Sequence, residues 1–262
     1  MFVNDFSHVA LSFWGLEMRW YGILFAVGLL LNFLLLQAIF KNEKYPLKHL
    51  DSVAVWLFFG LLFGARLGHV FFYEASYYLS HPVEILKVWN GGLASHGAII
   101  GLVIAYFSWC KVHKVKFLHY VDVLTLGMPL TGAFVRFGNF FNSELVGKPY
   151  DGPFAVVFKR LGEDFGRHPV QLYEADMNLL IFGVMLFLYW KFYRKAPRGF
   201  FFFLTLGLYF IGRFIAEFFK DHPVLWENLP ITMGQFLSLL MLVVPVVYFI
   251  FVMPRQDKRG SK

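Results

Sequence analysis

Residues 132–147, GAFVRFGNFFNSELVG, hold four polar side chains whose types and spacing could bind a ligand or take part in a reaction. These side chains are Arg136, Asn139, Asn142 and Glu144. An arginine beside hydrocarbon costs about 2.5–3.5 kcal/mol on insertion scales, so it needs a polar cavity or a partner. Arg136 and Asn139 are three residues apart and would share one face of a helix. Gly138 and the asparagines favour a break of the helix just there. We therefore expect a cationic donor, backed by amides and a carboxylate, that can hold an anion. Alternatively, Arg136 balances a buried carboxylate such as Glu144.

A second set of polar residues lies in a later apolar run, where Tyr209, Arg213 and Glu217 follow at four-residue spacing. This spacing puts the three side chains on one face of a helix. An arginine there could bind an anionic group. Alternatively, it could form a structural ion pair with Glu217 in which the two charges neutralise each other. The spacing alone leaves both alternatives open.

His96 is the candidate general base, because imidazole titrates near neutral pH. It follows Gly91, Gly92 and Ser95 and precedes Gly97, all small residues that allow another group to approach closely. A histidine at the start of a helix is more often a capping or packing residue, so that alternative also stays open.

Other polar and aromatic residues favour structural roles. Arg66, set among glycines, is expected to bond carbonyl oxygens and hold helices together. His168 before Pro169 is typical of the start of a helix. Tyr21 fits a belt of aromatic residues at the membrane interface.

The elements that must position these residues are membrane-spanning helices. The 262-residue chain has a mean hydropathy of +0.57 and a hydrophobic content of 58%. Its apolar runs of about 20 residues match the length needed to cross a bilayer about 30 Å thick. We therefore expect an all-α polytopic membrane protein. The net charge of +7 comes mainly from short loops rather than from one patch, so it does not indicate nucleic-acid binding.

The sequence lacks the signals of several other functions. Its single cysteine, Cys110, allows no internal disulfide, and no metal-type spacing of ligands occurs. It contains no Gly-Lys-Ser/Thr phosphate loop, no HExxH and no GxSxG. We expect no metal, no cofactor and no cleaved signal peptide.

Seven membrane spans are expected, in one integral membrane domain over residues 1–262. The spans cover about 19–40, 51–73, 96–109, 120–137, 169–193, 199–219 and 231–253. Between spans four and five, residues 138–168 form the longest extramembrane segment, which we expect to hold short strands or loops in a small head. In the second span, Gly60, Gly64 and Gly68 at four-residue spacing allow close helix contact.

Basic residues in the loops predict the orientation. Alternate short loops hold three, three, four and four lysines and arginines, the last four in the tail from Arg255 to Lys262. Basic loops stay cytoplasmic, so we expect the N-terminus and the 138–168 segment outside and the C-terminus inside. This orientation would bring six polar positions toward the outer half of the membrane. They are Arg66, His96, Arg136, Glu144, His168 and Glu217.

Several motifs, taken in order along the chain, resemble one known family. They are RWYG (19–22), GARLGHVFFY (64–73), WNGGLASHGAIIG (89–101), RFGNFFNSELVG (136–147), RHPVQLYEA (167–175), YFIGRFIAEFF (209–219) and MGQFLS (233–238). The chain resembles the prolipoprotein diacylglyceryl transferases of bacterial inner membranes. The resemblance covers all seven expected spans, and the 136–147 motif is specific.

The resemblance implies an activity and a set of site residues. The family transfers the sn-1,2-diacylglyceryl group of phosphatidylglycerol to the thiol of a lipobox cysteine in the signal-peptide region of a preprolipoprotein. The product is a thioether, and glycerol phosphate leaves. The implied fold is seven transmembrane helices with a small periplasmic head, in the cell inner membrane. The family's essential positions match Tyr21, His96, Arg136, Asn139, Glu144, Gly147, Tyr209, Arg213 and Glu217. Ser95 and Ala98 depart from residues common in the family, but outside these positions.

For that activity, Arg136 and Arg213 would bind the phosphodiester and stabilise the charge on the leaving glycerol phosphate. A thiol with a pKa of about 8.5 is mostly protonated at neutral pH. His96 would remove its proton, or the arginines would favour the thiolate directly; both alternatives stay open. Tyr21 is matched among the catalytic positions. The alternative functions are a lipid or anion transporter with a polar intramembrane cavity, and a purely structural assembly protein. Repeated halves or paired broken helices, typical of transporters, do not occur in the sequence.

Overall fold

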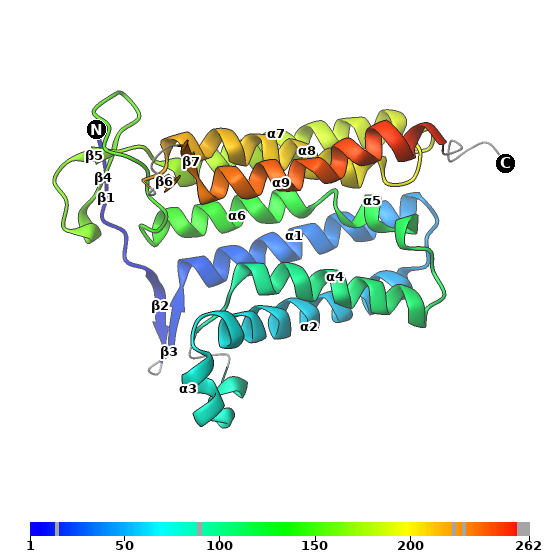
Figure 1. The fold of residues 1–262 in the computed structure, drawn as a ribbon, viewed down its shortest axis with the longest axis horizontal. Coiled ribbons are helices and arrows are strands. Elements are labelled where there is room, and N and C mark those ends of the chain that lie inside the picture. Colours follow the sequence, from blue (N-terminus) through cyan, green and yellow to red (C-terminus); the bar gives the residue numbers. More distant parts are fainter. Residues whose placement is uncertain (14–15, 88–90, 222–223, 227–228, 256–262) are drawn as a thin grey trace. The chain divides into compact units, whose positions relative to one another are not determined.

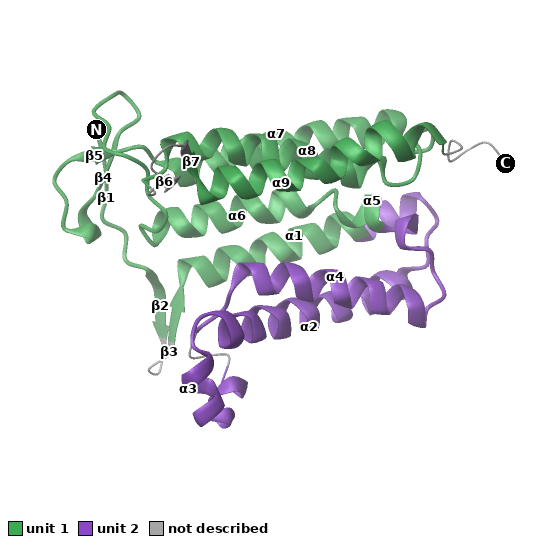
Figure 2. Ribbon diagram, viewed as in Figure 1, with its two compact units in different colours: residues 1–36, 121–262 green, residues 37–120 purple. Residues whose placement is uncertain are grey.

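The computed structural model describes residues 1–13, 16–87, 91–221, 224–226 and 229–255 (Figure 1). Contacts divide the chain into two compact units, residues 1–36 with 121–262, and residues 37–120 (Figure 2). Most of the expected basic tail, 256–262, lies outside the described residues. So do Trp89 and Asn90 of the WNGGLASHGAIIG motif.

Within the part of the chain that the structure describes, six helices are long and apolar enough to cross a membrane. They are α1 (Trp20–Asn42), α2 (Leu47–Phe72), α4 (Ser95–Val112), α7 (Val170–Phe192), α8 (Phe200–Ala216) with η5 (Glu217–Phe219), and α9 (Met233–Val247) with η6 (Tyr248–Val252) and η7 (Met253–Arg255). Each of the six covers one of the expected spans. The expectation of a helical, polytopic membrane protein is confirmed.

The expected fourth span, 120–137, is divided into two helices. Helix α5 covers Val121–Leu124 and helix α6 covers Met128–Phe141. A turn separates them, and Pro129 stands in the first turn of α6, where a missing N–H group is tolerated. Helix α6 has 14 residues, which corresponds to a length of about 21 Å. The seventh span therefore stays a prediction.

Helices α6, α7, α8 and α9 of the first unit pack in sequence order, each on the next. The buried carboxylate of Asp122 on α5 accepts hydrogen bonds from the backbone N–H groups of Gly199, at 2.7 Å, and Phe202, at 2.8 Å. Free N–H groups at a helix N-terminus bind a carboxylate favourably, so Asp122 fixes the beginning of α8. Thr232 and Gln235 form a capping box at the start of α9.

The N-terminal residues and the 138–168 segment share one small sheet. Its strands are β1 (Phe2–Asn4), β4 (Val156–Phe158) and β5 (Gly166–Arg167), with β1 parallel to β4 and β4 antiparallel to β5. The buried side chain of Asn4 donates to the carbonyl oxygen of Phe140 at 2.8 Å and ties the sheet to α6. The expectation of short strands and loops in 138–168 is confirmed, except that residues 138–141 still belong to α6.

Two hairpins complete the strands of the first unit. Strand β2 (Val9–Phe13) pairs with β3 (Leu16–Arg19), and β6 (Val224–Trp226) pairs with β7 (Leu229–Thr232). Strand β3 leads directly into α1, and β7 leads directly into α9. Each hairpin therefore lies directly before a long apolar helix.

The second unit is built on the close packing of α2 on α4. A Cβ atom on Gly68 would lie 2.6 Å from the Cα of Gly97, and one on Gly101 would lie 2.8 Å from the Cα of Gly64. Only glycine allows so close an approach of two backbones. The expectation that the glycines of the second span allow close helix contact is confirmed. After α2 come α3 (Ala75–Ser80) and the short helix η1 (Pro82–Leu86).

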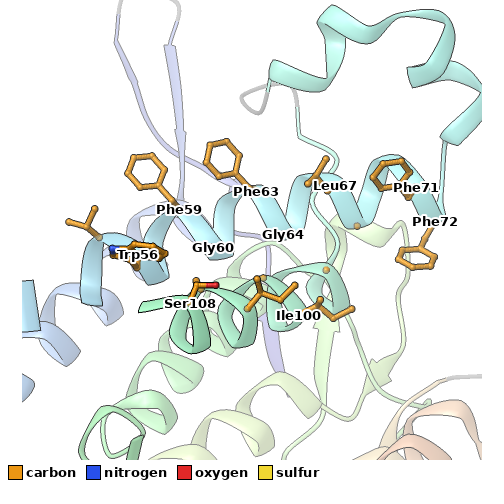
Figure 3. A pocket seen from close by; sticks show the side chains of 16 residues that line it. Trp56, Phe59, Gly60, Phe63, Gly64, Leu67, Phe71, Phe72, Ile100 and Ser108 are labelled. Carbon is orange, nitrogen blue, oxygen red and sulfur yellow. The ribbon is translucent and has the colours of Figure 1, made fainter. Parts of the chain in front are cut away.

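An apolar groove of about 550 Å³ runs along α2 and α4 (Figure 3). Phe59, Phe63 and Leu67 of α2 and Ile100 of α4 line it. All four side chains are exposed. A contiguous apolar surface of this kind is typical of contact with a membrane.

Candidate functional site

A buried carboxylate, that of Glu174 on α7, lies among the cations of the first unit. Arg136 Nε of α6 lies 3.0 Å from Glu174 Oε2, and Lys220 Nζ lies 2.9 Å from Glu174 Oε1. Arg213 Nη1 of α8 lies 3.8 Å from the same Oε1. Glu174 is only 2% exposed, and a carboxylate so deeply buried is costly unless cations pair with it. Glu174 thus gathers one cation from α6 and two from the stretch formed by α8, η5 and Lys220.

A second buried carboxylate, that of Glu217, extends this cluster. Glu217 Oε2 lies 3.2 Å from Lys220 Nζ, and Glu217 Oε1 accepts a hydrogen bond from Thr232 Oγ1 at 3.1 Å. Glu217 and Lys220 are both buried. Because Thr232 caps α9, the cluster also fixes the start of that helix relative to η5.

A chain of hydrogen bonds leads from Arg136 to an exposed carboxylate. Arg136 Nη1 donates to Asn139 Oδ1 at 3.3 Å, and Asn139 Nδ2 donates to Glu144 Oε2 at 2.9 Å. Asn142 Nδ2 donates to Glu144 Oε1 at 3.0 Å. The expectation that Arg136 and Asn139 share one helix face is confirmed. The carboxylate that Arg136 pairs with directly is Glu174, whereas it reaches Glu144 through the amide of Asn139.

The helix break expected around Gly138 and the two asparagines occurs at Asn142, the C-cap of α6, and not at Gly138 itself. Helix α6 continues to Phe141, and the chain turns only afterwards, with positive φ angles of 56° at Ser143 and 55° at Leu145. Gly138 serves a packing role instead, since a Cβ atom there would lie 2.9 Å from the Cα of Tyr21 on α1. The missing side chain lets α1 approach α6, which places the half-buried Tyr21 beside the helix that carries Arg136.

Gly147 holds the loop after α6 against the first unit. Its N–H group donates to the carbonyl oxygen of His168 at 3.0 Å, and its own carbonyl oxygen accepts from Arg167 Nη1 at 3.0 Å. A Cβ atom would lie 2.6 Å from the carbonyl oxygens of both His168 and Phe219. No side chain fits here without displacing backbone, so Gly147 fixes the position of Glu144 upstream and of Lys220 next to Phe219.

Arg213 pairs with Glu174 rather than with Glu217, the partner that the four-residue spacing predicted. The reason is that α8 ends at Ala216, and Glu217 begins the 3₁₀ helix η5. Tyr209 lies one turn before Arg213 on α8, and both side chains are half-buried. Arg213 keeps 29% of its side chain exposed, against 3% for Lys220.

The polar residues of the second unit follow a different pattern. Arg66 donates to the carbonyl oxygens of Ile85 at 2.9 Å, Gly91 at 2.6 Å, Gly92 at 3.2 Å and Glu84 at 2.5 Å. The expected structural role for Arg66 is confirmed, although the carbonyls belong to the segment after α2 rather than to the helices themselves. His96 is the second residue of α4, and its side chain is exposed.

His168 lies beside the cluster, just before α7. Its ring stacks on that of Tyr150 with 3.9 Å between centroids, and its Nδ1 lies 3.1 Å from the hydroxyl oxygen of Tyr173. Burial and the neighbouring Lys148 lower the pKa of His168 below its ordinary value. The neighbouring Arg167 pairs with Glu163, whose hydrogen bonds raise the pKa of that guanidinium.

Sequence reasoning did not give Glu174 and Lys220 their central place. Glu174 stands in an expected span, and a carboxylate in such a run marks a functional site by default. That signal was present in the sequence but was weaker than the arginines. Lys220 follows the end of an expected span, where a lysine is ordinarily solvated. Only the fold shows that its side chain turns inward.

In a multi-pass membrane protein, charged side chains enclosed among the helices mark a functional site by default, and here two arginines and a lysine lie around two carboxylates. The family model of prolipoprotein diacylglyceryl transferase matches residues 8–251. The chain therefore belongs to the prolipoprotein diacylglyceryl transferase family.

Relatives from distant bacteria agree with this assignment. The chain is 44% identical over 235 residues to the phosphatidylglycerol–prolipoprotein diacylglyceryl transferase of Tolumonas auensis, covering 88% of this chain and 90% of that protein. It is 39% identical to the protein of that name from Chloroherpeton thalassium, covering 93% and 91%. It is 34% identical to that from Campylobacter jejuni, covering 95% and 94%.

Proposed function

We propose that this protein transfers the diacylglyceryl group of phosphatidylglycerol to the lipobox cysteine of preprolipoproteins. The cysteine thiolate attacks the glyceryl carbon that carries the phosphate oxygen. A carbon–sulfur bond forms, the carbon–oxygen bond breaks, and glycerol phosphate leaves with the electron pair. The reaction needs no oxidant and no second substrate beyond the lipid and the protein.

The observation that carries this proposal is the cluster of Arg136, Arg213 and Lys220 around Glu174 and Glu217. A phosphodiester carries one negative charge and presents several oxygens to a planar guanidinium. The two arginines retain partial exposure, at 15% and 29% of their side chains. They are therefore the cations of the cluster that can meet the lipid phosphate and stabilise the charge that develops on it.

The remaining site residues take positions that suit this chemistry. Asn139 and Glu144 hold the donors of Arg136, and Gly147 fixes the loop that carries Glu144. Tyr21 lies against α6, Tyr209 precedes Arg213 on α8, and Glu217 binds Lys220. We assign these residues to binding of phosphatidylglycerol, with Tyr21 also among the catalytic residues.

We assign proton removal from the cysteine thiol to His96 on α4. Its imidazole is exposed at the beginning of the helix, where a substrate group can reach it. The expected consequence of His96→Gln is normal lipid affinity with turnover lower by about 10²–10⁴-fold. Normal turnover of this variant across a range of pH would show that His96 is not the base. The positive charge of the arginines would then favour the thiolate directly.

We further propose seven spans in the bacterial inner membrane, with α5 and α6 together forming the fourth span and residues 1–262 one integral membrane domain. The N-terminus and the 138–168 head then lie in the periplasm, and the C-terminus lies in the cytoplasm. The basis is the alternation of lysine and arginine among the loops. A reporter inserted near Gly152 should behave as periplasmic, and one fused after Lys262 should behave as cytoplasmic. The opposite result would place the site on the wrong side of the membrane for this reaction.

The test of the activity uses the purified protein, phosphatidylglycerol and a lipobox peptide. We expect release of glycerol phosphate that requires the cysteine and disappears when that cysteine is replaced by serine. Movement of lipid across a vesicle membrane without release would indicate the alternative, a lipid or anion transporter.

A further inference from the structure

Lys220 is a buried cation that the proposed reaction does not yet use. Its side chain is 3% exposed, and its Nζ lies between two carboxylates, 2.9 Å from Glu174 Oε1 and 3.2 Å from Glu217 Oε2. An ammonium enclosed in this way cannot reach a lipid in the site. Whatever Lys220 does for the substrate, it does through the two carboxylates.

The charges of the cluster do not balance without a ligand. Among the described residues, three cations, Arg136, Arg213 and Lys220, pair directly with only two carboxylates, those of Glu174 and Glu217. The third carboxylate nearby, that of Glu144, is exposed and bound by the amides of Asn139 and Asn142. One positive charge of this directly paired set therefore has no carboxylate of its own.

The geometry shows which cation is left over. Lys220 is within hydrogen-bond distance of both carboxylates, whereas Arg213 meets Glu174 at 3.8 Å, beyond a normal hydrogen bond. Lys220 thus takes up much of the negative charge that would otherwise hold the arginines. Arg213, whose other neighbour is Tyr209, keeps 29% of its side chain exposed.

We propose that Lys220 is a positioning residue that determines the selectivity of the site for an anionic lipid headgroup. By neutralising Glu174 and Glu217, it leaves one surplus positive charge on the arginines, matched to a phosphodiester that carries no cation of its own. A zwitterionic headgroup such as phosphocholine would bring its own ammonium to a site that already has an excess of positive charge. This inference rests on the proposed function, because it assigns a phosphodiester to the arginines.

The test compares headgroup preference in purified full-length variants, measured as binding of phosphatidylglycerol and phosphatidylcholine with identical acyl chains and without peptide. We expect Lys220→Met to lose about tenfold or more of the preference for phosphatidylglycerol, the scale of one charge-assisted hydrogen bond. In turnover assays the same change should appear mainly as a higher KM for the lipid. Lys220→Arg should retain the preference. The matched control is Lys159→Met, which removes a lysine from the exposed Lys159–Asp164 pair and should change nothing.

A second variant separates charge from packing. Lys220→Met combined with Glu217→Gln removes one cation and one carboxylate, so the surplus of one positive charge returns. We expect this double variant to regain most of the preference that Lys220→Met loses. If Lys220→Met does not fold, the test rests on the double variant. A folded double variant that does not prefer phosphatidylglycerol to phosphatidylcholine overturns the proposal. A folded Lys220→Met that prefers phosphatidylglycerol as the wild type does overturns it as well.

The wild-type protein distinguishes this inference from the proposed reaction. If it binds phosphatidylglycerol selectively through Lys220 but never releases glycerol phosphate, the inference stands and the transferase activity falls. If it releases glycerol phosphate and Lys220→Met keeps the preference, the activity stands and the inference falls.

Discussion

Both units contain arginines that are buried or partly buried, and their guanidinium groups are satisfied in opposite ways. Arg66 in the second unit directs its guanidinium at four backbone carbonyl oxygens and lies over the ring of Tyr78 at 4.8 Å from its centroid. Arg136 and Arg213 in the first unit face the carboxylate of Glu174 instead. These carbonyl oxygens take four of the five N–H donors of Arg66 and leave it little capacity for a ligand. The partners of a buried arginine therefore distinguish a structural role from a binding role better than its burial does.

The difference also concerns how each cluster responds to change. The carbonyls around Arg66 belong to Glu84, Ile85, Gly91 and Gly92, and each accepts a hydrogen bond from that side chain. The cluster around Glu174 joins α6, α7 and α8 through charged side chains that could rearrange around an anion. The second unit should therefore lose stability when its arginine is changed, and the first unit should lose activity.

The largest effect is expected for Arg136→Lys. Lysine keeps the charge next to Glu174 but offers a point charge in place of a planar fork. We expect a stably inserted protein whose release of glycerol phosphate falls about 10²–10³-fold, the effect of removing one donor to a developing anion. Thermal unfolding and turnover should be measured on the same preparation. A variant as active as the wild type would move the phosphate contact to Arg213.

Arg66→Met tests the other side of the comparison. Four carbonyl oxygens lose their donor, and each buried polar group left unsatisfied costs about 1–3 kcal/mol. Because the freed segment can partly rehydrate, we expect a total loss of about 3 kcal/mol in the free energy of unfolding. The folded fraction should retain its turnover. Reduced turnover at unchanged stability would show that Arg66 shares the function of the first-unit arginines.

Gly64→Leu sharpens the contrast at the level of packing. A side chain there would collide with the carbonyl oxygen of Gly97 on α4. We expect a loss of about 1–3 kcal/mol from overpacking. The matched control is Gly183→Leu on α7, where nothing lies within 4 Å of an added Cβ atom. Equal melting temperatures for the two variants would mean that the α2–α4 contact is not closely packed.

The smallest effect concerns pH and His168. Its lowered pKa in the folded protein means that the unfolded chain binds the proton more readily. The contribution of His168 to the free energy of unfolding should be fully present above the ordinary histidine pKa of about 6.5. It should be lost as the pH falls from there through the lowered pKa of the folded protein. His168→Gln should have a flatter melting temperature between pH 7.5 and 5 than the wild type, with Lys148→Met giving an intermediate slope. Identical slopes for wild type and His168→Gln would contradict this.

Much of the fold could be predicted from the sequence, because membrane spans have a strong local signal. Apolar length predicted six helices close to their observed bounds, and the spacing of Gly60, Gly64 and Gly68 predicted the α2–α4 contact. The division of the fourth span was missed, because a turn within an apolar run changes hydropathy little. The pairing of β1 with β4 was also missed, since strands of three residues carry almost no periodic signal.

The candidate site was predicted in part. Arg136 and Asn139 share a helix face because the interval of three residues requires it. The partner of Arg213 was not predictable from spacing, since Glu174 comes from another helix and long-range pairing has no local signature. The same holds for the inward turn of Lys220, which depends on where η5 ends.

The parallel pair formed by β1 and β4 has a consequence for biogenesis. Asn4 bonds to Phe140, a residue 136 positions later in the chain. Parallel strands need a crossover connection, and here that connection includes α1, α2, α4 and α6. The edge of β1 therefore stays unpaired with β4 until the helices between the two strands have been synthesised and inserted. A fusion partner placed before Met1 would act on this late pairing step, so protein tagged at the N-terminus should mature more slowly than protein tagged after Lys262.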